Sequence, residues 1–278
     1  MSEAHSQRVV HFYDTHPINE EQIMEKIAAA GDGSTVDEGF LMAHDQDHYG
    51  GTEAVDVLAR LAAIGPASHV LDVCSGLGGP ARYLADTTGC RVTGIDLTQS
   101  RVDGAERLTA LAGLAERVDF RCADAGDNRL PDGAFDAVIG EEAWCHVPNK
   151  ERLIGECARV LKVGGTTAFT DIVAGPELDG PKAERLSTDM AFTELATTDD
   201  YRNLLTAAGC TVFHIEDLTE TWATILVERL AMFRELRVPT TERFGAAHFR
   251  HWDDTYAFFI GLFRSGGLGG LRMAAKRE

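Results

Sequence analysis

The chain has 278 residues, of which 44% are hydrophobic, and this is ample for a buried core in one large α/β domain. Its 44 acidic and 26 basic residues give a formal net charge of −18 without any Lys/Arg-rich run, so nucleic acid and anionic membranes are poor candidates for partners. The N-terminus is too polar for a signal peptide and no apolar run approaches the ~20 residues that cross a bilayer, so we expect a cytoplasmic protein with free thiols.

The first part of the chain is expected to be mainly helical. Residues 7–30 have patchy helical periodicity, whereas residues 28–40 hold three glycines and are expected to form a loop. Residues 52–64 place Val55 and Leu58 on one face, which is the spacing of an amphipathic helix. A Gly-Pro dipeptide follows and predicts the end of this helix.

From residue 69 onward, short apolar runs alternate with helical stretches. Buried strands are expected at residues 69–74, 91–95, 118–122, 135–139, 166–173 and 211–215. Helices are expected between them, at residues 79–88, 100–114, 150–161 and 199–208. Strands separated by helices of about ten residues form right-handed βαβ units, so the sequence predicts an α/β fold with a parallel sheet.

The pattern changes near the end of the chain. Two helices are expected at residues 221–236 and 248–263, followed by a short final strand at residues 271–276. Residues 174–196 are polar and irregular. We interpret this stretch, together with the first 50 residues, as capping material over the carboxyl edge of the sheet.

These expectations give a division of the chain into a cap and a core. Residues 1–65 are expected to form an N-terminal helical cap or lid. Residues 66–278 are expected to form the core, with a late helical insertion around residues 220–265.

A glycine-rich loop follows the first predicted strand. Gly76 and Gly78 leave out side chains where a ligand must approach the backbone. The helix that begins here offers free N–H groups at its N-terminus. In doubly wound sheets the crevice at the carboxyl ends of the strands binds the ligand, so this loop is the strongest candidate for a cofactor site.

Two kinds of nucleotide cofactor are compatible with the loop. A G-x-G-x-x-A pattern starts at Gly76, and Asp96 lies about 20 residues further on, as in nicotinamide-dependent oxidoreductases. Asp72 inside the first strand and Asp124 after the third argue against a dinucleotide, because a pyrophosphate is repelled by carboxylates. An amino-acid ammonium group would be attracted by Asp72, and Asp124 could accept a hydrogen bond from an adenine amine.

The loop and the acids together resemble the class I S-adenosylmethionine-dependent methyltransferases. The stretch from Asp72 to Gly79 is similar to their glycine-rich first motif, although Cys74 stands where the family usually has glycine. Residues 135–136 and 161–165 are similar to later core motifs. The remaining matches are Asp96-Leu97, similar to the loop that holds the ribose, and Asp124-Ala125, similar to the adenine motif.

The resemblance covers roughly residues 52–216 and implies a fold and a cofactor. The fold is the Rossmann-like class I methyltransferase fold, a seven-stranded, mostly parallel sheet with an antiparallel last strand and a helical cap. S-adenosylmethionine would lie across Gly76, Asp96 and Asp124. Asp72, Gly78, Leu97, Ala125 and Glu141 would complete its contacts.

A second motif precedes the glycine loop, in Asp45-Gln46-Asp47-His48-Tyr49-Gly50-Gly51. It resembles a subgroup that includes sarcosine/dimethylglycine and other small-molecule methyltransferases, which implies that Gln46 and its neighbours fold over the cofactor. Alternating acids and histidines also suggest a metal site, but their order lacks a standard ligand spacing. We therefore expect a lid and no metal.

Candidates for acceptor chemistry follow the fourth predicted strand. His146 could be a general base near neutral pH, or it could cap the next helix or bind a backbone carbonyl. Trp144 could be a pocket wall or a core residue. Asp171 could line the acceptor cavity or serve as a turn residue. The candidates for catalytic roles are His146, Glu142, His48 and Asp171.

The sequence thus predicts a methyl transfer to a small molecule, with an amine nitrogen preferred. The preference comes from the subgroup resemblance and the acidic composition. Methylation of carbon or oxygen in an apolar natural product or isoprenoid stays open. Two other classes are a nicotinamide-dependent oxidoreductase and a non-catalytic regulator that binds the cofactor.

Overall fold

The computed structural model describes residues 3–14, 19–31, 36–46 and 48–278. Its centre is a seven-stranded sheet in the order β3-β2-β1-β4-β5-β7-β6. The strands are β1 His69–Val73, β2 Arg91–Asp96, β3 Val118–Cys122, β4 Phe135–Glu141, β5 Leu161–Ala174, β6 Cys210–Asp217 and β7 Leu268–Arg277. β7 runs antiparallel to β5 and β6 and the other pairs are parallel, as predicted.

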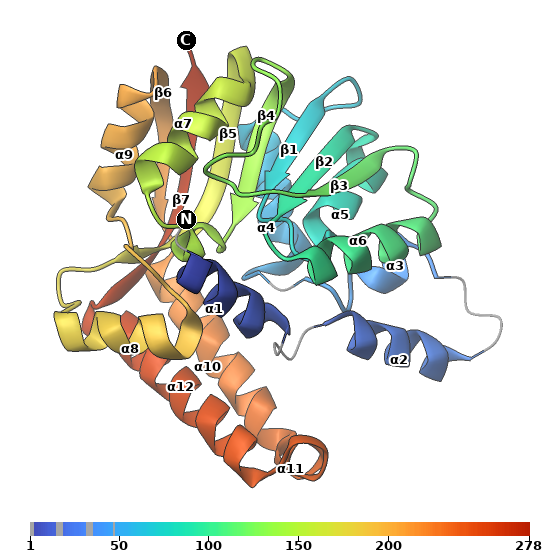
Figure 1. Ribbon diagram of the computed structural model, residues 1–278, viewed down its shortest axis with the longest axis vertical. Coiled ribbons are helices and arrows are strands. Elements are labelled where there is room, and N and C mark those ends of the chain that lie inside the picture. The colour runs from blue at the N-terminus through green and yellow to red at the C-terminus, as the bar shows by residue number, and fades with distance from the viewer. Residues whose placement is uncertain (1–2, 15–18, 32–35, 47) are drawn as a thin grey trace.

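Helices cover both faces of this sheet and its carboxyl edge (Figure 1). They are α1 Glu3–Asp14, α2 Glu20–Ala30, α3 Glu38–Leu41, α4 Gly51–Leu61, α5 Gly79–Thr88, α6 Gln99–Leu111, α7 Lys150–Val160, α8 Gly180–Met190, α9 Thr198–Ala207, α10 Thr219–Glu235, α11 Arg237–Phe244 and α12 Ala246–Ser265. A short 3₁₀ turn, η1 Trp144–His146, follows β4.

The core lies in two layers, one on each face of the sheet. On one face, Leu153 of α7 and Leu205 of α9 pack with strand residues such as Phe169. On the other face, Leu58 of α4 and Leu84 of α5 pack with further apolar strand residues. Because each strand is covered on both sides, the strands are continuous apolar runs in the sequence.

A third cluster forms the cap below the sheet in Figure 1. Leu226 and Leu230 of α10 pack against Phe259 and Phe263 of α12, together with Leu186 of α8. These residues form the core of the cap. The helices that carry them stand at the carboxyl edge of the sheet, where a ligand site is expected.

The predicted cap of residues 1–65 divides into two parts in space. α4 belongs to the core, since Val55 and Leu58 are fully buried against the sheet layer. Ile23 of α2 and Leu41 of α3 instead pack with Leu108 of α6 at one side of the fold. The division of the chain at residue 65 stays a prediction.

Three helices were not predicted from the sequence, and the first of them, α3, begins within residues 28–40, which were expected to form a loop. α8 lies in the stretch predicted to be irregular, and it begins where the Asp179 carboxylate accepts a hydrogen bond from the N–H of Lys182. A proline in its first turn is tolerated in a helix, although in sequence it suggests a loop. α11 contains Pro239 and has no buried residue. Two features of the sequence reading, Asp47 and residues 32–35 of the predicted loop, lie outside the described residues.

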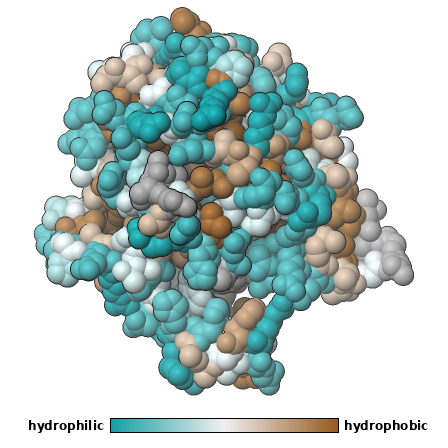
Figure 2. Space-filling view, in the orientation of Figure 1, coloured by the Kyte–Doolittle hydropathy of each residue, from teal (hydrophilic) through white to brown (hydrophobic). Residues whose placement is uncertain are grey.

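Hydrophilic residues cover most of the face seen in Figure 2, as the acidic composition suggests. No helix in the described part of the chain is long and apolar enough to cross a membrane.

Candidate active site

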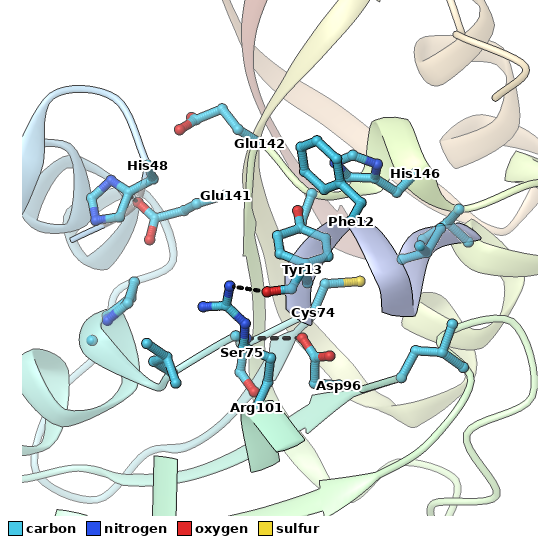
Figure 3. Close-up of a pocket in the computed structure, with 18 of the residues that line it drawn as sticks. Phe12, Tyr13, His48, Cys74, Ser75, Asp96, Arg101, Glu141, Glu142 and His146 are labelled. Atoms are coloured by element: carbon cyan, nitrogen blue, oxygen red, sulfur yellow. Dashed lines mark hydrogen bonds and ion pairs between the residues drawn. The ribbon is translucent and has the colours of Figure 1, made fainter. Parts of the chain in front are cut away.

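A cavity lies at the carboxyl edge of the sheet, between the strand tips and the cap (Figure 3). Its floor comes from the loops after β1, β2, β3 and β4, and its roof from α1, α10 and α12. The lining residues that the sequence had singled out are His48, Asp72, Gly76, Asp96, Leu97, Ala125, Glu141, Glu142 and His146. The structure therefore brings residues from most of the chain's length to one site.

The glycine loop opens its backbone toward this cavity. Gly76 has φ of +52°, and a Cβ built on it would meet no atom within 4 Å. Cys74, at the position where the resembled family usually has glycine, also has a positive φ, +67°. A side chain in this region costs of order 1 kcal/mol, so a strained cysteine forms part of the cavity wall.

Asp96 fixes the shape of the loop at the tip of β2. One carboxylate oxygen accepts a hydrogen bond from the N–H of Gly76 at 2.9 Å, and the other accepts one from the N–H of Thr98 at 2.8 Å. Burial raises the pKa of Asp96, and these two hydrogen bonds oppose that rise. A carboxylate oxygen has further lone pairs, so Asp96 can also accept hydrogen bonds from vicinal hydroxyls.

Several buried acids lie around the glycine loop, in a cavity whose lining also holds Arg101 and Arg229. Burial, with a smaller contribution from the charge of Asp96, raises the pKa of Asp72 to about 7. Burial, followed by the charges of Glu142 and Asp72, raises the pKa of Glu141 well above its usual value. Among the described residues, Asp72 Oδ2 and both carboxylate oxygens of Glu141 have no hydrogen-bond partner. This arrangement would bind a cationic ligand, since buried charges require compensation.

Glu142 lies beside these acids and holds the segment before α4. Its Oε2 accepts a hydrogen bond from the N–H of Tyr49 at 2.6 Å, whereas its Oε1 is buried without a partner among the described residues. Burial raises the pKa of Glu142 to about 7. His48 Nδ1 lies 3.6 Å from Glu141 Oε1, and Figure 3 shows the two side chains together at one side of the cavity.

Gln46 and Gly78, which were expected to contact the cofactor, are not among the residues that line the cavity. The Gln46 side chain donates to Asp45 at 2.9 Å and accepts from His48 at 2.7 Å, so its polar atoms are used within its own segment. Gly78 allows close packing, because a Cβ there would lie 2.4 Å from the Phe120 ring and 3.0 Å from Arg82 Nη1. Contact of Gln46 and Gly78 with the cofactor therefore stays a prediction.

Asp124 and Asp171 are also away from this cavity. Asp124 accepts a hydrogen bond from the N–H of Gly126 and faces a separate polar depression, while its neighbour Ala125 lines the cavity. Asp171 is fully buried inside β5, where it accepts hydrogen bonds from the Cys145 N–H at 3.0 Å and the Tyr201 hydroxyl at 2.7 Å. Asp171 does not line the cavity, and a catalytic role for it stays a prediction.

The 3₁₀ turn after β4 places its two candidate side chains, Trp144 and His146, in different surroundings. Trp144 is fully buried and stacks on Phe169 at 4.3 Å, so it is a core residue. His146 lies in the cavity wall with its Nδ1 3.3 Å from the carbonyl oxygen of Ala191. If Nδ1 carries the proton that this contact needs, Nε2 has the lone pair of a neutral imidazole. His146 therefore contacts a backbone carbonyl and lines the cavity, and its role as a general base stays a prediction.

The roof of the cavity was largely missed. Tyr13 of α1 lies 5.3 Å from the His146 ring, and its carbonyl accepts a hydrogen bond from Arg101 at 2.8 Å (Figure 3). Phe12 packs at 6.0 Å from Trp252 of α12. The direction of a cap helix depends on tertiary packing and not on local pattern, so the sequence did not identify which α1 side chains face the cavity.

Within the described residues, no group of three or more His, Cys, Asp or Glu is arranged to hold a metal ion. His48 and its neighbours are instead connected to one another and to Glu141.

Comparison with known proteins agrees with this geometry. The family described as "Methyltransferase domain" matches residues 71–169. The glycine/sarcosine/dimethylglycine N-methyltransferase of Actinopolyspora halophila is 31% identical over 193 residues, 68% of this chain and 34% of that protein. The sterol 24-C-methyltransferase of Eremothecium gossypii is 37% identical over 135 residues, 48% of this chain and 36% of that protein.

A solved structure gives a match along the whole chain. The geranyl diphosphate C-methyltransferase of Streptomyces coelicolor, in complex with Mg²⁺, geranyl diphosphate and S-adenosyl-L-homocysteine, has a TM-score of 0.72 and 19% identity. The match covers 100% of this chain and 99% of that one. It confirms the expected fold.

The present chain spans about a third of the length of the two curated relatives described above. The matched region nevertheless contains the glycine loop and the acids at the tips of β1, β2 and β4. The chain therefore belongs to the class I S-adenosylmethionine-dependent methyltransferase family.

Proposed function

We propose that this chain transfers a methyl group from S-adenosylmethionine to a small-molecule acceptor. The observation that carries the proposal is the set of buried carboxylate oxygens without partners around the glycine loop, on Asp72 and Glu141. S-adenosylmethionine has a sulfonium and an ammonium group, and each would compensate negative charge in this low-dielectric site. A dianionic dinucleotide would add charge of the same sign.

The remaining parts of the cofactor also find suitable residues. The ribose hydroxyls would donate to Asp96, whose two oxygens already accept from the backbone of the loop. The open side of Gly76 leaves room for the ligand to approach the backbone. Leu97 and Ala125 would flank the adenine on the cavity floor.

The aromatic side chains in the roof of the cavity favour an acceptor that has a cationic group or another group that binds to aromatic rings. Trp252 and Tyr256 line the cavity, and aromatic faces attract cations. Glu142 adds a carboxylate oxygen without a partner among the described residues. An amine nitrogen is therefore the preferred methyl acceptor, and the relative named for glycine, sarcosine and dimethylglycine supports this preference.

The protein's contribution to the chemistry would be alignment and proton handling. S-adenosylmethionine supplies a methyl carbon that is already activated toward an in-line displacement. Holding the acceptor in line with that carbon is worth roughly 7–11 kcal/mol at best. An amine must reach the site neutral or lose a proton there, and His146 in the cavity wall would accept this proton.

Carbon methylation of an apolar acceptor is the second candidate. Phe12, Phe192 and Trp252 give the cavity an apolar side, and the relative named as a sterol 24-C-methyltransferase is 37% identical over its matched part. An apolar alkene would need no base before attack, but the carbocation formed by methyl transfer must then lose a proton, so a base would act after the transfer step.

A regulator without catalysis would bind the cofactor but have no room for an acceptor. The lining of the cavity by cap residues such as Arg229 and Tyr256, beyond the loop residues, argues for an acceptor compartment. A cavity beneath the cap and a net charge of −18 also support a small molecule in preference to nucleic acid. The six free cysteines support a reducing compartment such as the cytoplasm.

The test is methyl transfer from methyl-labelled S-adenosylmethionine to two panels of acceptors. One panel holds primary, secondary and tertiary amines with and without a carboxylate, and the other holds prenyl alcohols, prenyl diphosphates and sterols. Label in an amine product supports the proposal, and label in a carbon product supports the second candidate. Tight binding of S-adenosylhomocysteine without transfer to either panel would contradict the methyltransferase assignment and favour the regulator.

A further inference from the structure

A buried arginine connects the glycine loop to the segment before α4. Arg82, in the second turn of α5, is fully buried. Its Nη1 donates to the carbonyl oxygen of Leu77 in the glycine loop at 2.7 Å. Its Nη2 donates to Asp45 Oδ2 at 2.5 Å. One guanidinium thus holds two segments that are far apart in sequence.

The connection continues from Asp45 to the cavity. Asp45 Oδ1 accepts a hydrogen bond from Gln46 at 2.9 Å, and Gln46 Oε1 accepts one from His48 Nε2 at 2.7 Å. His48 Nδ1 lies 3.6 Å from Glu141, one of the acids on the cavity floor. We call this series, Arg82–Asp45–Gln46–His48–Glu141, the polar chain.

Two glycines of the loop make room for the polar chain. A Cβ on Gly79 would lie 2.7 Å from Gln46 Nε2 and 2.9 Å from the carbonyl oxygen of Asp45. A Cβ on Gly78 would lie 3.0 Å from Arg82 Nη1. The glycines therefore allow the segment before α4 to rest directly on the loop, which gives them a role besides ligand approach.

Glu38 of α3 also contacts Arg82 but stands outside the polar chain. Its Oε2 lies 3.3 Å from Arg82 Nε, and both side chains are buried. Burial raises the pKa of Glu38 to about 8, against the opposing effect of Arg82. At neutral pH it is therefore mostly protonated, and Asp45 is the carboxylate that balances the arginine.

From these contacts we infer that Arg82 is a positioning residue for cofactor binding. Through Asp45 and Gln46 it holds His48 and Glu141 in the geometry that receives the cationic end of the cofactor. Because the polar chain ends at the acid cluster, loosening it would raise the dissociation rate of the cofactor more than it would slow the transfer step. This inference rests on the proposed function.

The test compares Asp45→Asn with the matched variant Glu38→Gln. Each removes one carboxylate beside Arg82, but only Asp45 continues to the cavity. For Asp45→Asn we expect the Kd of S-adenosylhomocysteine to rise roughly ten-fold or more. The KM for S-adenosylmethionine should rise in parallel, while kcat at saturating cofactor changes by less than about three-fold. For Glu38→Gln, which resembles the protonated acid, both values should stay within about two-fold.

A second variant interrupts the polar chain at another residue, so the inference can be tested even if Asp45→Asn does not fold. Gln46→Leu removes the link between Asp45 and His48 but leaves the ion pair intact, so it should show the same rise in Kd with a smaller change in Tm. Unchanged Kd values in Asp45→Asn and Gln46→Leu, with a lower Tm in either, would overturn the inference and leave Arg82 a structural residue. A wild-type chain that binds no S-adenosylhomocysteine would overturn the proposed function itself, and this inference with it.

Discussion

Asp72 shows how the binding site lowers the stability of the protein that contains it. Its pKa rises from 3.8 to about 7 on folding, so between these values the folded state binds a proton that the unfolded state lacks. Stability of the ligand-free protein must then fall as the pH rises from about 4 to about 7, and the full loss is present above that range. Such a cost is common at sites that await a ligand.

We predict that Asp72→Asn raises the Tm of the ligand-free protein at pH values above 7, by about 5 °C, because the buried charge is removed. The same variant should bind S-adenosylmethionine more weakly. Asp86→Asn, an exposed acid on α5, is the control and should change neither property. Differential scanning calorimetry measures the first effect and isothermal titration the second. A lower Tm in Asp72→Asn would show that the carboxylate stabilises the empty site.

His146 is the residue whose role depends most on the acceptor. If it accepts a proton from an amine, His146→Gln should reduce kcat roughly 100-fold, while the Kd of S-adenosylhomocysteine changes little. His214→Gln, on the edge strand β6, is the control. Steady-state kinetics over a range of pH give the measurement. Wild-type turnover in His146→Gln would assign the histidine to packing against Phe192 and Tyr13.

At the residue scale, the sequence predicted the floor of the site better than its roof. Asp72, Gly76 and Asp96 could be found because parallel strands end at one edge, so residues at successive strand tips must converge. Glu141, which the resemblance placed beside the cofactor, lines the cavity together with Glu142. Asp124 was expected there, but the direction of a side chain in a turn is not fixed by sequence position.

At the element scale, α1 covers the cavity from outside the two main core layers. Phe12 and Tyr13 line the cavity, and hydrogen bonds from Arg101 to the Tyr13 carbonyl and from His5 to the His146 carbonyl connect the helix to the rest of the protein. A helix held this way can open without loss of the sheet.

We therefore predict that removal of residues 1–14 accelerates dissociation of S-adenosylhomocysteine by roughly ten-fold or more, because the ligand is then open to solvent. The Tm of the ligand-free protein should change by only a few degrees, since the two main core layers contain no residue of α1. Stopped-flow displacement measures the rate. Equal dissociation rates in the full-length chain and in the chain without residues 1–14 would mean that α1 does not cover the bound ligand.

The strands and most helices were predictable because their signals are local. β1 to β4 lie within a residue or two of the expected positions, since apolar runs buried on both faces are easily recognised. α8 was not, because its polar and proline-containing first turn resembles a loop, and its one fully buried residue, Leu186, gives no periodicity. The order of strands came from resemblance to a family and not from the pattern of residues.

For the whole molecule, the central feature is the distribution of negative charge. A protein with net charge −18 gathers unpaired acids at the carboxyl edge of its sheet, and a sulfonium nucleoside compensates them. Asp72 and Glu142 each titrate near pH 7 in the empty site, so protons compete with the cation for the same carboxylates. Binding of the cation must then weaken as the pH falls through 7, because the acids become neutral.

The most direct measurement is isothermal titration of the purified chain with S-adenosylmethionine at about pH 6 and at about pH 7.5. The account predicts one molecule bound per chain, with higher affinity at the higher pH and with proton release at the lower one. Equal affinity at both pH values, or no binding of S-adenosylmethionine at millimolar concentration, would contradict it.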